Sequence, residues 1–414
     1  MTQAAEIAAP GAPAPPAPIP ALAIPLLSLA AFASGVSLRV TDPLLPRLAG
    51  EFSISLGAAS HVVTVYSVAY GLAQLFFGPL GDRYGKYRVV SWACAAAGLT
   101  SLVCALAPGL DVLLVGRLLT GAASAAAIPL SMAWIGDVVP YAVRQPVIAR
   151  FLIGQFFGIS GGVLLGGLAA DMLGRRVPFA IIALVFLAVA LGLTLLDRRL
   201  PAHARQTRQA DGPALRRLVG EFGAVLARPW ARVVLLLVYL EGGFVYGAFA
   251  FIASHLHTVF GISLSSAGFV VMLFGLGGLV FAAASRRLLR SFGEAGIALG
   301  GGILMCLALG AIAAAPRWSW ALPGCGVLGL GFYMLHNTLQ THATQMAPER
   351  RGAAVATFAA CFFLGQSSGV AAAGALVGSL GTPSVIGAGA TGTLLVAVAF
   401  SALLACSPLA PRRH

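Results

Sequence analysis

Long apolar runs separated by short polar segments recur along the whole chain. Each run holds about 20 residues or more, the length that an α-helix needs to cross roughly 30 Å of hydrocarbon. The segments between them are rich in residues that end helices and form turns. The runs lie near residues 22–45, 57–80, 88–108, 112–136, 148–170, 176–197, 232–256, 264–285, 295–315, 319–345, 353–378 and 384–406. This pattern predicts twelve membrane-spanning helices.

The composition favours a membrane over water as the surrounding medium. Of the 414 residues, 59% are hydrophobic and only 9% are charged, whereas about a quarter of the residues of a water-soluble chain are charged. A chain in hydrocarbon must satisfy its backbone polar groups internally, which a helix does within one segment. We therefore expect an all-α membrane protein.

The basic residues are distributed unevenly among the polar segments. The chain carries 26 Lys and Arg against 13 Asp and Glu, a net charge of +13. If the N-terminus is cytoplasmic, 20 basic residues fall in cytoplasmic segments and only four fall in segments on the other side. Such an excess is the usual topology signal, so it predicts no nucleic-acid partner. We expect a multi-pass protein of the inner or plasma membrane with both termini in the cytoplasm.

A polar segment at the midpoint divides the runs into two sets of six. It covers residues 198–231 and joins predicted bundles at 21–197 and 232–406, with cytoplasmic tails at 1–20, expected to be disordered, and 407–414. Eight residues recur after 207 positions: Arg144, Ala149, Phe151, Gly158, Gly162, Val163, Gly167 and Gly174 correspond to Arg351, Ala356, Phe358, Gly365, Gly369, Val370, Gly374 and Gly381. This repeat predicts two pseudo-symmetric six-helix bundles with a substrate path between them.

The segment between the second and third runs combines glycines with charges. It reads GPLGDRYGKYR. Glycines permit tight turns and close approach of helix ends, so the segment predicts a charged latch at the membrane surface. A loop that only sets the topology is the alternative. The predicted latch residues are Gly78, Asp82, Arg83, Gly85, Lys86 and Arg88.

This segment resembles the GxLxDRxGRR loop of the major facilitator superfamily, from which Tyr87 departs. The resemblance implies the major facilitator fold, transport by alternating access, and neither an enzymatic activity nor a cofactor. In that family the loop acid helps to lock the two halves in the outward-facing conformation, and the match gives this role to Asp82. The implied partners are a small-molecule substrate, protons and the lipid bilayer, with the protein as a monomer.

Two further segments resemble motifs of the drug:proton antiporter branch of that family. The run Arg117-Leu-Leu-Thr-Gly121 is similar to the fourth-helix motif, whose buried Arg is implicated in proton coupling. An Arg that snorkels to the outer surface is the alternative. The fifth run is similar to the glycine-rich motif of exporters, although Val163 replaces its proline. Its small residues predict close helix packing at Gly158, Gly162, Gly166 and Gly167.

Charges inside the apolar runs are few, and each is costly there. Arg39 and Asp42 share one helical face and can pair, and Asp42 with the following PLLP segment resembles the first-helix acid pattern of drug exporters. Glu241 lies near the middle of the seventh run, where removal from water favours a neutral carboxyl group and suits a proton carrier. We predict that Glu241, Asp42, Arg117 and Arg39 couple proton entry to substrate exit. Structural carboxylates are the alternative for both acids.

Polar and aromatic side chains inside the runs are candidates for a substrate cavity. Three of them recur at every fourth position of the second run, and the tenth run is unusually polar. Such walls suit a lipophilic substrate. Ordinary helix packing is the alternative, above all for His336. The predicted cavity residues are Tyr66, Tyr70, Gln74, Tyr246, Phe332, Tyr333, His336, Asn337 and Gln340.

Common motifs of ATP-driven pumps and zinc metalloproteases are missing from the sequence. It contains no GxxxxGK[ST] or HExxH segment, and we predict no metal site. The sequence favours a secondary transporter that exports a lipophilic drug-like compound or metabolite against protons, a function that confers multidrug resistance. Proton-coupled uptake of a sugar or organic acid is the alternative, and a membrane sensor or intramembrane enzyme is the second.

Overall fold

The structure, a computed structural model, describes residues 19–205 and 214–406. Within these ranges every regular element is a helix. The first eight α-helices form the N half: α1 (Ala23–Arg39), α2 (Leu45–Glu51), α3 (Leu56–Tyr84), α4 (Lys86–Leu106), α5 (Leu110–Ser124), α6 (Ala127–Val138), α7 (Tyr141–Leu168) and α8 (Arg176–Asp197). A linker helix, α9 (Ala214–Leu226), precedes the C half: α10 (Pro229–Phe260), α11 (Leu264–Met272), α12 (Phe274–Ala314), α13 (Ala321–Gln345) and α14 (Arg351–Cys406).

Twelve membrane crossings can be traced through the described ranges. Eight helical stretches there are long and apolar enough to cross a bilayer. Two of them, Leu264–Ala314 and Pro348–Ala405, contain 51 and 58 residues, far more than the roughly 20 that one crossing needs. Each is broken once, at Gly293 and at Gly381, and so supplies two crossings. With the shorter apolar helix α1 and with α13, the prediction of twelve spans is confirmed.

Local sequence signals set several helix ends. The side chain of Ser55 caps the first turn of α3 by accepting a hydrogen bond from the amide of Ala58 at 3.1 Å. Ser263 caps α11 in the same way, with the amide of Ser266 at 3.1 Å. Helix α10 ends at Gly261, whose φ of 67° lies in the left-handed region that glycine tolerates best.

Three predicted boundaries are wrong. The first run was expected to form one helix over 22–45, but α1 ends at Arg39 and a turn separates it from α2. Two prolines in this segment lack the amide hydrogen that a continuous helix needs. The loops expected at 286–294 and 379–383 are replaced by single glycines, because Gly293 and Gly381 have φ values of 65° and 76° and reverse the chain without further residues. Of the two predicted tails, all but residues 19 and 20 lie outside the described ranges.

The sequence repeat is visible in individual helix contacts. A Cβ atom on Gly158 of α7 would meet the carbonyl oxygen of Phe32 in α1, and one on Gly365 of α14 would meet that of Tyr239 in α10. Both partners are displaced by the same 207 residues. The contact recurs one turn later, where Gly162 meets Val36 and Gly369 meets Gly243. The two halves are therefore pseudo-symmetric, as predicted.

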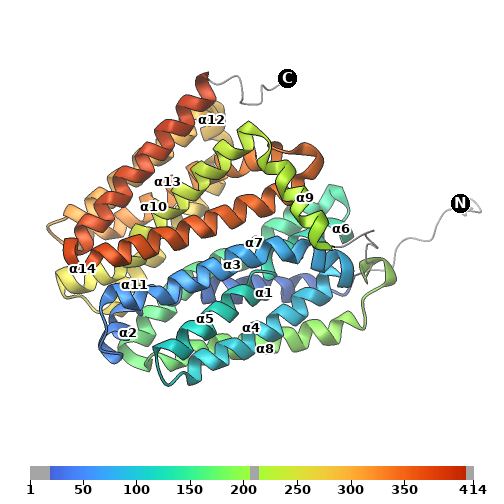
Figure 1. The fold of residues 1–414 in the computed structure, drawn as a ribbon, viewed down its shortest axis with the longest axis horizontal. Helices are drawn as coiled ribbons and strands as arrows, with labels where there is room; N and C mark the ends of the chain where they lie inside the picture. Colours follow the sequence, from blue (N-terminus) through green and yellow to red (C-terminus); the bar gives the residue numbers. More distant parts are fainter. Residues whose placement is uncertain (1–18, 206–213, 407–414) are drawn as a thin grey trace, which may run out of the picture.

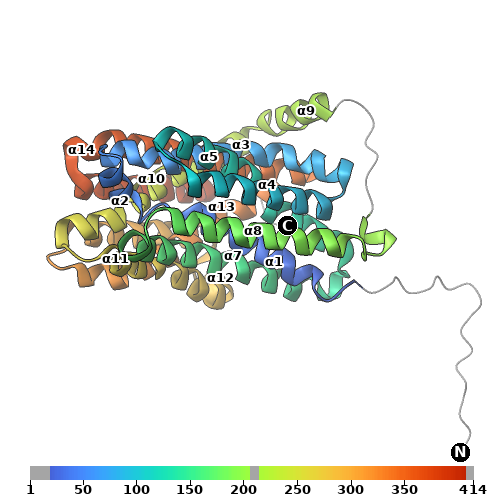
Figure 2. The ribbon, with the colours of Figure 1, turned by 90° about the horizontal axis from the view of Figure 1, so that it is seen from below.

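The helices run side by side between two ends of the molecule (Figure 1). We call the end that carries α9 and α6 the linker face, and the end that carries α2 and α11 the opposite face. Figure 2, turned by 90°, again shows α2 and α11 together at one end. In Figure 1 the two halves lie close together at the opposite face and diverge toward the linker face.

Contacts between the halves close the opposite face. The hydroxyl of Ser367 in α14 donates to the carbonyl oxygen of Thr64 in α3 at 3.2 Å. Nearer the opposite face, a Cβ atom on Gly57 of α3 would meet the carbonyl oxygen of Gly374 in α14. Such backbone approach needs small residues on both helices. The path between the halves is thus sealed at this end of the molecule.

Candidate functional site

Arg117 lies inside a polar network of the N half. Arg117 belongs to α5 and is 1% exposed. The guanidinium donates to the carbonyl oxygens of Ser37 at 2.9 Å and Val62 at 3.3 Å. Its central carbon lies 4.0 Å from the centre of the Tyr66 ring, in cation–π geometry. Arg117 therefore ties α5 to α1 and α3, and the alternative that it snorkels to the surface is wrong.

Arg39 links the two halves. Its Nη1 lies 3.5 Å from Oδ2 of Asp42, the pair that the spacing allows. Its Nη2 donates to Oε1 of Gln366 in α14 at 3.0 Å, and its guanidinium carbon lies 3.9 Å from the centre of the Tyr246 ring in α10. Gln366 in turn donates to the hydroxyl of Ser67 in α3 at 2.8 Å. This buried chain of contacts crosses between the halves twice.

Glu241 forms a separate pair with His336 in the C half. Oε2 of Glu241, on α10, lies 2.9 Å from Nδ1 of His336, on α13. The carboxylate is fully buried, whereas the imidazole is 15% exposed. The other oxygen of Glu241, Oε1, has no hydrogen-bond partner among the described residues. The charge of this carboxylate is thus balanced locally only when His336 is protonated.

Aromatic rings surround His336. Its ring lies 5.0 Å from that of Phe332, 4.6 Å from that of Phe362 and 5.5 Å from that of Phe358, measured between centroids. Tyr246 packs edge-to-face on Phe332 at 5.7 Å. Two predicted cavity residues, Tyr246 and Phe332, therefore join the ionic groups of both halves into one continuous assembly.

A polar stripe on α13 leads from His336 toward the linker face. It begins near Tyr333, which is half-buried and whose backbone carbonyl oxygen accepts a hydrogen bond from the side-chain amide of Asn337 at 2.9 Å. Residues three and four apart lie on one side of a helix. The stripe continues through three exposed residues, Gln340, Thr341 and Thr344. The polar density predicted for the tenth run thus becomes an exposed path that ends at a buried ionic pair.

The predicted cavity residues of α3 are enclosed instead. Tyr66 is 0% and Tyr70 2% exposed, and their rings stack at 5.9 Å. The hydroxyl groups of Tyr66 and Ser124 are hydrogen-bonded at 2.7 Å. Gln74 is also buried. The expectation that these three line an open cavity is not met in this structure, because all three are buried, and Tyr66 packs on Arg117.

The charged latch makes its contacts within the N half. Nζ of Lys86 lies 2.5 Å from Oδ2 of Asp137 and 4.0 Å from Oδ1 of Asp82. Arg88 pairs with Asp197 at 3.3 Å. These ion pairs join the start of α4 to α3, α6 and α8. Arg83, by contrast, lies over the ring of its neighbour Tyr84 at 5.1 Å.

The latch segment contains the latch glycines Gly78 and Gly85 and a third glycine, Gly81, and these three have different roles. Gly85 joins α3 to α4 in one step with a φ of 91°, where a side chain would be strained. A Cβ atom on Gly81 would lie 2.7 Å from Cδ2 of Leu130, so this glycine does permit close packing. Gly78 has no such neighbour within 4 Å. The close approach predicted at Gly78 is therefore absent in this structure.

The glycines of the α7 motif lie against the backbone of neighbouring segments. Gly158 and Gly162 each face a backbone carbonyl of α1, and Gly166 faces the carbonyl of Val40, the residue after α1. Gly167 faces the carbonyl of Leu264 in α11 and so lies against the other half. Close packing by small residues thus holds α1 and α7 together without the proline that the motif lacks here.

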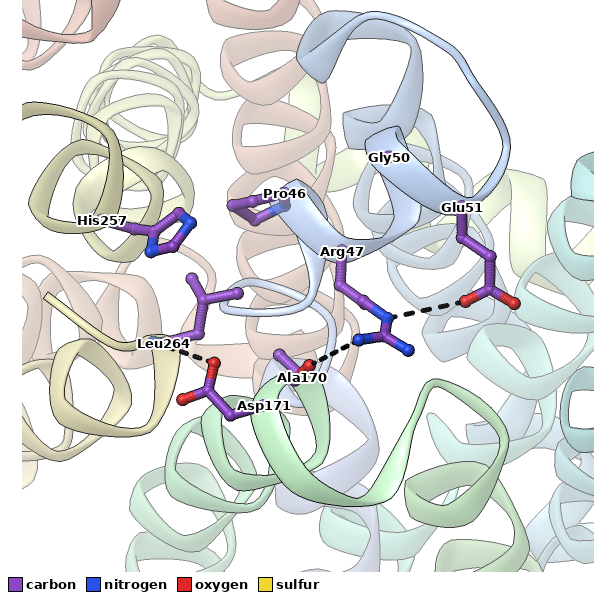
Figure 3. A pocket seen from close by; sticks show the side chains of 8 residues that line it. All are labelled: Pro46, Arg47, Gly50, Glu51, Ala170, Asp171, His257 and Leu264. Carbon is purple, nitrogen blue, oxygen red and sulfur yellow. Dashed lines mark hydrogen bonds and ion pairs between the residues drawn. The ribbon is translucent and has the colours of Figure 1, made fainter. Parts of the chain in front are cut away.

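A pocket of about 500 Å³ lies between the halves at the opposite face (Figure 3). Asp171 of the N half accepts hydrogen bonds from the amides of Leu264 at 3.3 Å and Ser265 at 2.6 Å. These amides begin α11, so a carboxylate of one half caps a helix of the other. Arg47 donates to the carbonyl of Ala170 at 3.3 Å. The pocket walls thus add polar contacts to the closure of this face.

Sequence reasoning missed Gln366 and Asp171. Gln366 occupies the repeat position of Ile159, so a polar residue in place of an apolar one was an available signal. Asp171 gave no such signal, because capping of a distant helix depends on the tertiary fold. In the described ranges, no group of three or more His, Cys, Asp or Glu residues is arranged to hold a metal ion.

Comparisons with known proteins agree with this architecture. The model of the family described as Major Facilitator Superfamily matches residues 27–351. The uncharacterized MFS-type transporter YwfA of Bacillus subtilis is 27% identical over 252 residues, which cover 61% of this chain and 60% of YwfA. The multidrug export protein EmrB of Escherichia coli is 27% identical over 199 residues, which cover 48% of this chain and 39% of EmrB. Both matches span less than two thirds of the relative's length.

A solved structure resembles the whole fold. The crystal structure of the nucleoside transporter NupG matches with a TM-score of 0.73 at 17% identity, and the match covers 92% of this chain and 99% of that one. Similarity at this level of identity concerns the arrangement of the helices, and substrates differ widely among proteins of one fold.

Proposed function

Because the chain belongs to the major facilitator superfamily and is therefore a multi-pass membrane transporter and not an enzyme, we propose that it exports a lipophilic drug-like compound or metabolite in exchange for protons. The observation that carries the proposal is the pair of Glu241 and His336. Glu241 is fully buried, and its one ionisable neighbour among the described residues is His336. The number of protons on this pair therefore decides whether a net charge remains in the membrane interior.

The proton step uses both members of this pair. With a neutral His336, ionised Glu241 leaves an uncompensated negative charge in an apolar site, and one proton on either group removes it. The imidazole is the more exposed member, and it stands at the inner end of the polar stripe on α13. We infer that His336 passes protons between water at the linker face and Glu241.

Residues of the N half contact the groups that surround this pair. Arg39 contacts Tyr246 and Gln366 of the C half, and Tyr246 packs on Phe332, whose ring stacks on that of His336. A change of charge at Glu241 therefore acts on groups that connect the halves. Protonation in one conformation and release in the other would couple rocking of the halves to proton movement.

Export requires a defined orientation. We take the linker face as the cytoplasmic side of the inner or plasma membrane, because the excess of basic residues favours this orientation. With the opposite face closed, this is then the inward-facing arrangement. Substrate would enter from the cytoplasm beside the exposed stripe on α13, against the aromatic rings of Phe332 and Tyr246. The similarity to EmrB, a multidrug export protein, supports export over uptake.

A resistance screen tests this function. The wild-type protein should raise the inhibitory concentration of at least one lipophilic compound in a host that lacks its own exporters, and Glu241→Gln should abolish the increase. A matched control is Glu294→Gln, which alters the second His–Glu pair, with His342, at 3.3 Å in the same half. Accumulation of the compound by the wild-type protein, or resistance that survives Glu241→Gln, would contradict the proposal.

A further inference from the structure

Two interfaces hold the halves together at the opposite face, and the sequence repeat relates one to the other. We call them the α7–α11 interface and the α3–α14 interface. A Cβ atom on Gly167 of α7 would meet the carbonyl oxygen of Leu264 in α11, and one on Gly374 of α14 would meet that of Gly57 in α3. Both residues of the first pair are displaced from those of the second by the same 207 positions. Each interface therefore contains the same backbone contact.

Only the α7–α11 interface has an acidic residue at one particular repeat position. Asp171 lies in the turn after α7, and its Oδ1 accepts the amide of Leu264 in the other half at 3.3 Å (Figure 3). Its Oδ2 accepts the amide of Ser265 at 2.6 Å, and the hydroxyl of Ser265 donates back to the carbonyl oxygen of Gly167 at 3.3 Å. We call these three hydrogen bonds the clasp. The position that corresponds to Asp171 in the α3–α14 interface is Gly378, which has no side chain.

The first turn of α11 obtains its hydrogen-bond acceptors from both halves. The first amides of an α-helix have no partner within the helix. The side chain of Ser263 accepts the amide of Ser266 at 3.1 Å, and Asp171 accepts the two amides before it. The helix dipole also favours a negative charge at this end. Separation of the halves at the opposite face would therefore take both an acceptor and a favourable charge away from α11.

The clasp lies where water can replace it. Asp171 is exposed and lines the pocket of about 500 Å³ between the halves. Farther along α7, Val163 is only 1% exposed, and a Cβ atom on Gly268 of α11 would lie 2.9 Å from its carbonyl oxygen. Hydrogen bonds at an exposed edge can be exchanged for bonds to water without leaving buried polar groups unpaired. The clasp is thus suited to break and form again in each transport cycle.

We propose that Asp171 is a gate residue, whose contact with the start of α11 sets the balance between the states closed and open at the opposite face. Rocking of the halves as rigid bodies separates both interfaces together, so loss of the clasp also favours opening of the α3–α14 interface. The inference goes beyond the proposed function, because it does not depend on the substrate, the coupling ion or the direction of transport.

Neutralisation of Asp171 tests this proposal. Asp171→Asn keeps the shape of the side chain but removes its charge and leaves one acceptor oxygen for two amides. The matched control is Glu51→Gln, because Glu51 lines the same pocket and pairs within the N half, with Arg175 at 2.6 Å. Single cysteines in a background without other cysteines report opening by their labelling rates. Val163→Cys reports on the α7–α11 interface and Ser60→Cys on the α3–α14 interface, since both residues are buried.

Asp171→Asn should raise the labelling rates of both reporters about fivefold, the size expected from loss of a carboxylate at an exposed helix N-terminus. Glu51→Gln should leave both rates near those of the parent protein. Cys94, restored as the single cysteine, is buried within the N half at 1% exposure. It reports unfolding, and its rate should stay unchanged in Asp171→Asn.

A rise at only one of the two reporters would overturn the proposal, because the contact would then have a local effect and would not control the gate. Unchanged rates at both reporters, equal rates in Asp171→Asn and Glu51→Gln, or an equal rise at Cys94 would overturn it as well.

Discussion

The two halves share their helix packing but surround their buried acids with different groups. In the N half, Asp42 lies 3.5 Å from Arg39, and Arg117 belongs to the same polar region. In the C half, the described neighbour that can balance Glu241 is His336 at 2.9 Å. Both carboxylates have at most 1% exposure, so burial alone does not distinguish them. The difference lies in their partners.

Those partners differ in whether their charge can change. A guanidinium keeps its proton under all ordinary conditions, so Arg39 and Arg117 are fixed positive charges. An imidazole, by contrast, can be either neutral or protonated. The N half therefore holds a permanent ionic anchor, and the C half holds a pair in which either group can carry the proton. We therefore propose that the N-half charges contribute mainly to stability and that the C-half pair couples transport to protons.

Removal of Arg117 should give the largest effect on stability. Arg117→Met removes the hydrogen-bond donor to Ser37 and Val62 and a positive charge near Asp42. Removing one partner of a buried ionic interaction typically lowers the free energy of unfolding by about 3–5 kcal/mol. Glu241→Gln keeps size and hydrogen-bonding capacity and should cost far less. Thermal unfolding in detergent, followed by intrinsic fluorescence, compares the two variants. If the melting temperature of Glu241→Gln is equal to or below that of Arg117→Met, the N-half charges are not the main source of stability.

A smaller effect is expected from Gln366→Leu, which removes the link from Arg39 to α14. Hydrogen bonds to charged groups contribute roughly 1.5–3 kcal/mol. The equilibrium constant for opening of the opposite face should therefore rise at least tenfold. The labelling rate of Ser60→Cys, in a background without other cysteines, reports this opening because Ser60 is buried beside Gly374.

Gln74→Leu is the matched control for that experiment, because Gln74 is buried in α3 and makes no cross-half hydrogen bond in the described ranges. Its labelling rate should stay near that of the parent protein. Equal rates for Gln366→Leu and Gln74→Leu would show that the Arg39 contact does not hold the halves together.

The spans and the repeat could be predicted because apolar length and spacing are local properties of the chain. The turns at Gly293 and Gly381 could not, since a single glycine gives no loop signal. Spacing along one helix showed that Arg39 can meet Asp42, but its contacts with Gln366 and Tyr246 depend on how the halves meet.

The same limit applies to the coupling pair. Glu241 stood out as a carboxylate deep in an apolar run, whereas His336, 95 residues away in sequence, was predicted as a cavity residue, with helix packing as the alternative. The tertiary fold brings them together. The same fold encloses Tyr66 and Tyr70, whose spacing fits a cavity wall and a packed interface equally well.

Proton-driven transport by purified protein in proteoliposomes tests the central claim most directly. The compound found in the resistance screen and a pH-sensitive dye in the lumen report substrate and proton movement together. Glu241→Gln should reduce transport driven by a pH gradient at least tenfold and retain exchange of substrate without a gradient, while Glu294→Gln should match the wild-type protein. Gradient-driven transport that persists at the wild-type rate in Glu241→Gln would contradict the account.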